Sequence, residues 1–229
     1  MQNITNQNMP NKILSIRIST DGFYFSTQSY TVRKEFLHER SYARLKMEFE
    51  NLLRHQTDFD VLEVAFESSK FSFFPNAYAN AEPDFRKLFD VADNECVMRQ
   101  YVEGTDMFML YTADADLCEY FRTKSERVSF CHTLTPLLLQ LPEDGAARRL
   151  YLDVYSRRVY ALVAENSGLL FANSFLCDSD EQFLYAIADI FTQFSLNQQE
   201  TAVFYTDFDR AKAKKALLQK YIKNVVERG

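Results

Sequence analysis

The sequence predicts an α/β protein of two lobes, and three observations lead to this fold class. Short apolar runs are separated by turn residues, apolar side chains recur at helical spacing, and the charge changes along the chain. Residues 1–147 carry 15 Lys and Arg against 22 Asp and Glu, whereas residues 148–229 carry 11 against 10. A turn-like cluster at 141–145 lies beside this change. We therefore expect a first lobe in residues 1–145 and a second, compact lobe in residues 146–229.

The second lobe has the clearest order of elements. It opens with three apolar runs joined by short turns, which indicate an antiparallel meander of strands at 150–155, 158–165 and 169–175. Acidic residues at 178–181 are typical of a helix start, and apolar side chains follow at spacings of three and four up to Phe194. A strand at 201–206 and a final helix from Arg210 to Arg228 complete the order β-β-β-α-β-α.

The first lobe begins in the same way and then carries insertions. A strand hairpin is expected at 13–18 and 23–27, and a third strand at 60–67 follows a polar stretch with a helix near 40–53. The remaining elements are a strand at 71–74, a helix at 83–89, a hairpin at 96–102 and 107–111, and helices at 115–121 and 133–141. A repeated β-β-β-α-β-α plan is the organisation of ribonuclease-H-like folds. Two such lobes facing one another make the actin-like ATPase architecture, an analogy of topology that does not by itself fix function.

Several segments resemble one uncharacterised bacterial family. The run 169–175, followed by 180–187, is similar to a hallmark of that family, and 220–225 is similar to its C-terminal signature. The opening strand at 14–19 and the strand that ends at Phe74-Pro75 also look similar. The family is found mainly in Bacteroidetes, and its fold is actin-like. The resemblance spans most of the chain and implies the fold, but it implies no activity and no catalytic residues.

An actin-like ATPase would need two phosphate-binding hairpins, one in each lobe. Each needs an Asp near the end of its first strand for Mg²⁺, and a Gly just beyond it so that backbone N–H groups can approach the phosphate. In the first hairpin, Arg17 stands where the Asp should be, and Ser19 stands where the Gly should be. A cation at position 17 could contact a phosphate but would repel Mg²⁺. Asp21-Gly22, a little further on, is typical of a tight hairpin turn.

The second hairpin and the adenosine site depart from the pattern in a similar way. Asp153 is retained, but Tyr155 and Ser156 replace the glycines. The residues after the strand at 201–206 contain no Gly pair, and the bulky Phe208 follows them. Phosphoryl transfer depends on positioning and charge stabilisation, much of which Mg²⁺ supplies. The sequence therefore predicts neither a catalytic residue nor a metal site.

These observations favour a non-catalytic module with an actin-like ATPase fold that acts in protein–protein interaction, through an unknown partner or through self-association. The alternative is a nucleotide-binding protein with weak or no ATP hydrolysis that uses the cleft between the lobes. Mg-ATP would then be the ligand, held by Arg17, Ser19, Asp153 and Ser156.

Other functions fit the sequence less well. The net charge of −6 argues against a broad nucleic-acid surface, and no apolar stretch is long enough to span a membrane. The four cysteines form no C-x-x-C pair, so we expect buried, reduced thiols and a cytoplasmic location. Nuclease chemistry would need carboxylates such as Asp21, Glu67 and Asp153 to converge on metals, and Arg17 would intrude there. His132 directly follows Cys131, and neighbours on a strand point to opposite faces, which disfavours a catalytic pair.

The expected final helix is strongly basic. Its cations are Arg210, Lys212, Lys214, Lys215, Lys220, Lys223 and Arg228, against the single acid Glu227. An apolar stripe on such a helix fits ordinary packing against a sheet. Contact with an anionic membrane surface or with an acidic partner is the alternative.

Overall fold

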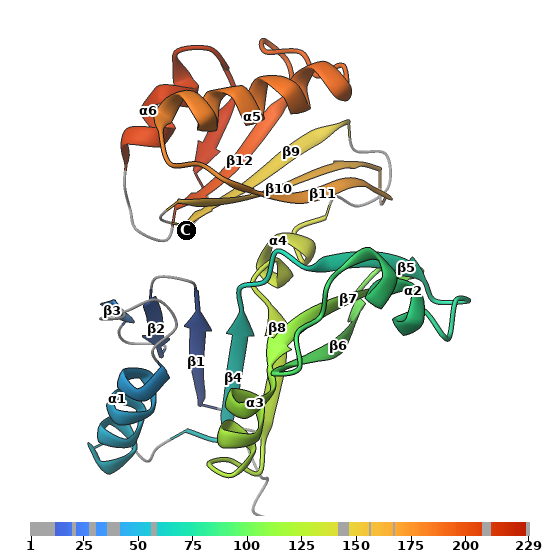
Figure 1. Ribbon diagram of the computed structural model, residues 1–229. Coiled ribbons are helices and arrows are strands. Elements are labelled where there is room, and N and C mark those ends of the chain that lie inside the picture. Colours follow the sequence, from blue (N-terminus) through green and yellow to red (C-terminus); the bar gives the residue numbers. More distant parts are fainter. Residues whose placement is uncertain are drawn as a thin grey trace, which may run out of the picture. The chain divides into compact units, whose positions relative to one another are not determined.

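The computed structural model describes most of the chain, and the chain divides into two compact units (Figure 1). The described residues are 12–19, 22–27, 31–35, 42–55, 59–141, 147–155, 157–166, 168–207 and 212–227. The first unit comprises residues 1–100 and 108–133, and the second comprises residues 101–107 and 134–229.

The first unit contains a five-stranded sheet, an inserted three-stranded sheet and three helices. In chain order its elements are β1 (Ile13–Ile18), β2 (Gly22–Ser26), β3 (Thr31–Glu35), α1 (Tyr42–His55), β4 (Val61–Phe66), β5 (Phe71–Pro75), α2 (Glu82–Leu88), β6 (Glu95–Val102), β7 (Met107–Asp114), α3 (Ala115–Arg122) and β8 (Val128–His132). The five-stranded sheet has the order β3-β2-β1-β4-β8. Its first three strands are antiparallel, and β1, β4 and β8 run parallel.

Aromatic side chains fix the helices of the first unit to its sheet. Phe49 of α1 contacts both β2 and α3. Its ring centroid lies 6.0 Å from that of Phe25 in β2 and 5.3 Å from that of Phe121 in α3. Phe49 and Phe121 are fully buried. Asp114 starts α3 because its side chain accepts a hydrogen bond from the N–H of Leu117.

The inserted sheet, with the order β5-β7-β6, has a small core of its own. Phe85 of α2 and Phe108 and Leu110 of β7 are buried there with Ala81. The ring of Phe74 stacks on that of Phe108 with 5.8 Å between their centroids. This insertion follows β4 and ends where α3 begins, so it extends the first unit without interrupting the order of its larger sheet.

The second unit repeats the larger sheet of the first. Its elements are α4 (Thr135–Leu138), β9 (Arg149–Tyr155), β10 (Arg158–Glu165), β11 (Gly168–Leu176), α5 (Asp180–Gln193), β12 (Ala202–Asp207), α6 (Lys212–Gln219) and β13 (Val225–Glu227). The order is β11-β10-β9-β12-β13, again with three antiparallel strands followed by parallel ones. Ser179 caps α5 by accepting from the N–H of Gln182, and Phe183, Ile187 and Ile190 of α5 pack on the sheet.

The two sheets correspond strand by strand, since β1, β2, β3, β4 and β8 match β9, β10, β11, β12 and β13. Helices α1 and α5 precede the fourth strand, and α3 and α6 precede the fifth. This order confirms the predicted α/β class and the ribonuclease-H-like plan in both halves of the chain.

Three sequence predictions about local structure were wrong. The final helix was predicted from Arg210 to Arg228, but α6 ends at Gln219 and β13 follows it. Leu218 and Ile222 are both buried, so the apolar spacing is real, but Val225 pairs with Val203 of β12 instead of continuing the helix. The predicted helix at 133–141 is only the single turn α4, and the strands β3 and β8 were not predicted. Both strands are short; β3 pairs with β2, which directly precedes it, and β8 is determined by pairing with the distant strand β4.

Candidate functional site

Two buried charged residues occupy the same position in the two sheets. Arg17 of β1 and Asp153 of β9 are each the fifth pair of a parallel ladder, β1 with β4 and β9 with β12. Each lies opposite a buried tyrosine on the neighbouring antiparallel strand, Tyr24 for Arg17 and Tyr160 for Asp153. Arg17 is 7% exposed and Asp153 is 3% exposed. The same place in the fold therefore holds a basic residue in one unit and an acidic residue in the other.

The alternation of side chains along a strand explains which face these residues occupy. In β9, the flanking residues Leu152 and Val154 belong to the core beneath α5. Asp153 consequently projects from the opposite face of the sheet. In β1, Arg17 likewise lies between two buried residues, Ile16 and Ile18. Its side chain therefore projects from the face of the sheet opposite to theirs.

Of the other predicted contact residues, Ser19 follows Arg17 by two positions and is described by the structure. Ser19 is 5% exposed, and both its N–H and its Oγ donate to the carbonyl of Gly22 at 2.9 Å. The N–H of Ser19 therefore closes the β1–β2 hairpin. In a phosphate-binding hairpin this N–H would instead donate to the phosphate. Tyr155, at the end of β9, is buried, and Ser156 lies outside the described residues, as do Asp21 and Phe208.

Two arginines beside Asp153 in the sequence have partners of their own. Arg157 forms an ion pair with Asp178 at 2.8 Å, and both side chains are about half exposed. The Nη1 atom of Arg158 donates to Ser174 Oγ at 3.4 Å on the neighbouring strand. These contacts tie the start of β10 to β11 and to the segment that precedes α5.

A buried polar network joins the larger sheet of the first unit to the inserted sheet. The hydroxyls of Ser68 and Thr112 are 2.9 Å apart, and Thr112 Oγ1 donates to Glu95 at 3.3 Å. Lys70 Nζ donates to the other Glu95 oxygen at 2.6 Å. His132, which is fully buried, places Nε2 2.9 Å from the carbonyl oxygen of Ser68. This contact is with a backbone carbonyl oxygen, which cannot act as a nucleophile.

Sequence reasoning missed this network, because its members are spread from residue 68 to residue 132. Burial opposes ionisation of Glu95, but the hydrogen bonds from Lys70 and from the N–H of Ala92 outweigh it and lower its pKa. The arrangement fits a structural junction in which one carboxylate accepts from the buried Thr112 and from the more exposed Lys70 and Ala92.

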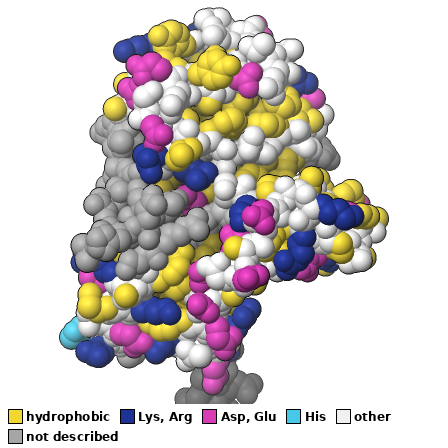
Figure 2. Space-filling model, in the orientation of Figure 1, with side chains coloured by type: hydrophobic (Ala, Val, Ile, Leu, Met, Phe, Trp, Pro, Cys, Tyr) yellow, Lys and Arg dark blue, Asp and Glu magenta, His cyan; other side chains and the backbone are white. Residues whose placement is uncertain are grey.

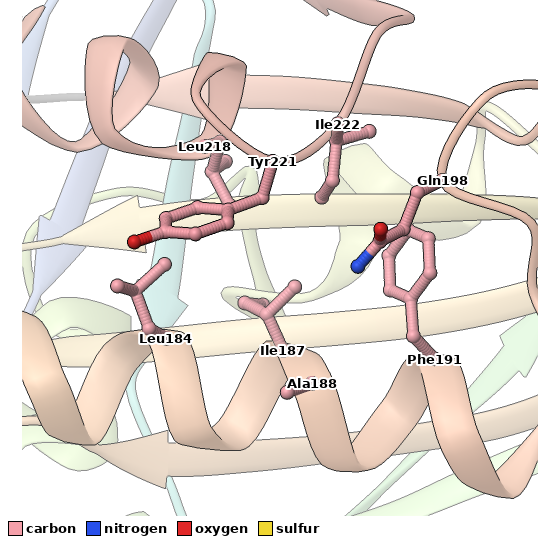
Figure 3. Close-up of a pocket in the computed structure, with 8 residues that line it drawn as sticks. All are labelled: Leu184, Ile187, Ala188, Phe191, Gln198, Leu218, Tyr221 and Ile222. Atoms are coloured by element: carbon pink, nitrogen blue, oxygen red, sulfur yellow. The ribbon is translucent and has the colours of Figure 1, made fainter.

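Two grooves flank α5 in the second unit, one with an apolar lining and one whose lining includes Glu181 and Asp189. The first has a volume of about 150 Å³ and lies between α5 and the segment around α6 (Figure 3). Its apolar side chains converge from both sides, with Gln198 at one end; they are Leu184, Ile187, Ala188, Phe191, Leu218, Tyr221 and Ile222. The second, of about 630 Å³, lies between β11 and α5. Tyr185 lines this second groove and is 77% exposed.

Three of the large exposed apolar side chains of this unit, Leu176, Tyr185 and Tyr221, lie in the grooves beside α5. Figure 2 shows hydrophobic side chains over the face of the second unit on which α5 lies in Figure 1. Among the described residues of this unit, the other large apolar residues that are exposed are Tyr101, Leu139, Leu170 and Val226. Apolar surface that is grouped in this way is typical of an interaction site.

The lysines of α6 are partly engaged within their own unit. Lys215 forms an ion pair with Glu227 at 2.5 Å, and Lys214 lies over the ring of Phe183 at 5.2 Å. Arg210 and Arg228 lie outside the described residues. In the described ranges, no helix has the length and apolar character to cross a membrane. Among those residues no group of three or more His, Cys, Asp and Glu side chains could hold a metal ion.

The thiol of Cys118 is expected to resist alkylation while the chain is folded. Burial raises its pKa to about 12, and the Cys96 thiol, whose sulfur lies 3.9 Å away, adds to the rise. Because the thiolate is the reactive form, iodoacetamide at about pH 8 should modify Cys118 only after unfolding. Mass spectrometry of the alkylated peptides checks this, with the urea-unfolded chain as control. Modification of Cys118 at equal rates in both samples would contradict the prediction.

Comparisons with known proteins agree with this fold. The family described as "Protein of unknown function (DUF3822)" matches residues 1–225. A Bacteroides thetaiotaomicron protein with an actin-like ATPase fold and unknown function is 20% identical, with a TM-score of 0.73 over 95% of this chain and 91% of that chain. None of the curated protein sequences matches this chain.

Two further solved structures are more distant. The ethanolamine utilization protein EutJ from Carboxydothermus hydrogenoformans is 7% identical, with a TM-score of 0.51 over 98% of this chain and 87% of that chain. A filament structure of AlfA from a B. subtilis plasmid is 9% identical, with a TM-score of 0.50 over 95% and 92%. At such identities the likeness shows the fold alone.

Proposed function

The chain belongs to the DUF3822 family of proteins of unknown function, and we propose that it is a non-catalytic module that uses an actin-like ATPase fold for protein–protein interaction. We place it in the cytoplasm, because its four cysteines are free thiols, the form that a reducing compartment maintains.

The observation that carries the non-catalytic part of the proposal is the buried guanidinium of Arg17. It occupies the ladder position that Asp153 occupies in the second unit, where the ATPase mechanism requires an acid for Mg²⁺. A guanidinium, which is 7% exposed here, offers no oxygen ligand and so cannot hold Mg²⁺ as an aspartate would. The N–H of Ser19 is already bonded to Gly22, which removes a donor that a phosphate would need.

The surface around α5 supports the interaction part of the proposal. An exposed tyrosine, Tyr185, stands beside a groove, and exposed Leu176 borders the same groove. Tyrosine is enriched among the residues that dominate binding energy at protein interfaces. Monomeric proteins seldom leave such apolar groups together without a function.

Nucleotide binding with weak or no hydrolysis is the second candidate. Asp153 favours it, because a carboxylate that is 3% exposed near the end of a central strand is placed as a magnesium ligand would be. Arg17, Ser19 and Ser156 would supply the remaining contacts with the phosphates.

Thermal unfolding with and without millimolar Mg-ATP tests the two candidates. We expect the same midpoint in both, because the phosphate-binding positions are altered. A ligand at about 100 times its Kd would add about 2.7 kcal/mol, or roughly 5–11 °C for a chain of this size. ADP and tripolyphosphate serve as controls. A rise that is specific for nucleotide and absent in Asp153→Asn would establish the second candidate instead.

A further inference from the structure

We infer that β11 is a dimerisation strand, which pairs in antiparallel orientation with β11 of a second copy of this chain. The two second units would then share one continuous sheet. This inference rests on the proposed interaction function and names the partner as the chain itself.

Among the residues that the structure describes, β11 is an edge strand without charged residues. In the described part of the chain, β11 has a hydrogen-bonded neighbour on one side only, β10. Its nine residues, GLLFANSFL, include no charged residue and no proline. Natural proteins commonly protect edge strands with charges, prolines or strong bulges, because a free edge is a template for another strand. The bulge in β11 lies near its start, opposite Val163 and Ala164, and leaves the rest of the strand regular.

The matching edge strand of the first unit is protected. β3 holds the same place in its sheet as β11, and three of its five residues are charged, namely Arg33, Lys34 and Glu35. Lys34 also forms an ion pair with Glu48 of α1 at 3.7 Å. The chain therefore contains two corresponding edge strands, of which β3 is charged and β11 is not. The requirements of the fold cannot explain this difference, since both strands occupy the same position in the same plan.

The backbone of β11 presents hydrogen-bonding groups outward. The N–H of Cys177, just after the strand, donates inward to the carbonyl of Arg157 at 2.7 Å. Because the groups alternate along an antiparallel ladder, those of Ala172, Ser174 and Leu176 point away from β10. The N–H of Ser174 donates to the Asn173 side chain at 2.8 Å, as expected for a group that does not reach β10. A pairing strand would replace that single local contact with a regular ladder.

Two properties of the strand point to a second copy as the occupant. A two-fold axis brings each residue near the axis against its own counterpart, so any charge there would meet a like charge. A strand without charges avoids this repulsion. The axis is perpendicular to the sheet, so both α5 helices lie on the same face of the joined sheet. Tyr185 and Leu176, which are 77% and 54% exposed, line the groove beside β11 and would be covered there.

The groove beside β11 adds to the surface area that the dimer would bury. A stable interface buries at least about 1,000 Å² in total, which is more than a pair of strands supplies by itself. The groove of about 630 Å³ between β11 and α5 runs beside the seam, and side chains of the second copy would contact its apolar residues, Phe175, Leu176 and Tyr185. Backbone pairing would fix the register, and this contact would supply the additional buried area.

Sedimentation velocity of the full chain over about 1–100 µM tests the inference, and we expect a reversible monomer–dimer equilibrium. Asn173 is exposed and lies next to the middle of β11. Asn173→Lys and Asn173→Glu should each raise the dimer Kd at least about tenfold, because like charges meet across the axis. Mixing the two variants in equal amounts should restore dimers, since opposite charges then face each other. That rescue also shows that both variants fold.

Tyr221→Lys is the matched control, because Tyr221 is 54% exposed but lines the other groove of α5. It should leave the dimer Kd unchanged. A wild-type chain that stays monomeric throughout the range overturns the inference, as does a mixture that fails to restore dimers or an equal effect of Tyr221→Lys. A monomer that binds an extended segment of another protein also overturns it. None of these outcomes changes the midpoint of thermal unfolding with Mg-ATP. The proposed function is therefore tested independently of the dimer.

Discussion

Replacing Phe183 with alanine is expected to lower the free energy of unfolding of the second unit by about 3–5 kcal/mol. The side chain is fully buried in the core that α5 forms with β9, β10 and β12. Its removal loses the transfer free energy of the ring and leaves a cavity that the neighbouring strands cannot fill. Lys214 also loses the ring face that lies 5.2 Å from its Nζ atom.

Urea and thermal unfolding measure this effect, and for a chain of this length the midpoint should fall by roughly 6–20 °C. Tyr185→Ala is the matched control, since Tyr185 lies on the same helix two residues away and is 77% exposed. Tyr185→Ala should change the free energy of unfolding of the monomer by no more than about 0.5 kcal/mol. Hydrogen exchange should show the loss of protection in β9 and β10. Equal costs for the two variants would contradict the assignment of Phe183 to the core.

Local signals made the repeated part of the fold predictable. The strands of the second unit are separated by residues that suit turns, including Asn166, which adopts a positive φ of 54°. The start of α5 is marked by Ser179 and the acids that follow it. In such segments propensity, pattern and tertiary position agree, so the sequence alone is enough.

The errors arose where distant contacts determine the structure. Val225 and Val226 follow an apolar helical stripe, and only pairing with β12 makes them a strand. The five residues of β8 pair with β4, which lies more than 60 residues earlier. A single sequence contains no signal for such pairings, because their stability comes from the sheet already in place.

The candidate site was predictable only in part. Comparing the two hairpins in the sequence assigned Arg17 and Asp153 to corresponding positions, and the ladders place them at the same register. Whether they contact a nucleotide stays a prediction. The network of Ser68, Thr112 and Glu95 could not be predicted, because ordinary polar residues from separate loops and strands carry no local motif.

Glu95→Gln is expected to lower the free energy of unfolding by about 1.5–3 kcal/mol at neutral pH. The carboxylate of Glu95 accepts from Lys70 Nζ at 2.6 Å and from the N–H of Ala92 at 2.9 Å. It also accepts from Thr112, which is 3% exposed. The neutral amide keeps the shape of the side chain but loses the charge that strengthens these bonds.

The destabilisation by Glu95→Gln should become smaller as the pH falls. The pKa of Glu95 is lowered in the folded chain, so its charge contributes stability that is fully present above the unfolded pKa of about 4.3. This contribution is lost as the pH falls through the lowered folded pKa. Urea unfolding from about pH 7 to about pH 2.5 should therefore show a constant difference between wild type and Glu95→Gln above about pH 5, and a shrinking difference below it.

Glu82→Gln is the control for a charge change at the surface of the same insertion. Glu82 pairs with Arg86 at 2.9 Å, but both side chains are about half exposed, so its loss should cost less than about 0.5 kcal/mol. A double-mutant cycle with Lys70→Met should give a coupling above about 1 kcal/mol for Glu95 and none for Glu82. An equal cost for Glu95→Gln and Glu82→Gln would show that the network does not hold the insertion. Because Ser68 and Lys70 follow β4 while Glu95 and Thr112 belong to the inserted sheet, the coupling measures how firmly that sheet is attached to the first unit.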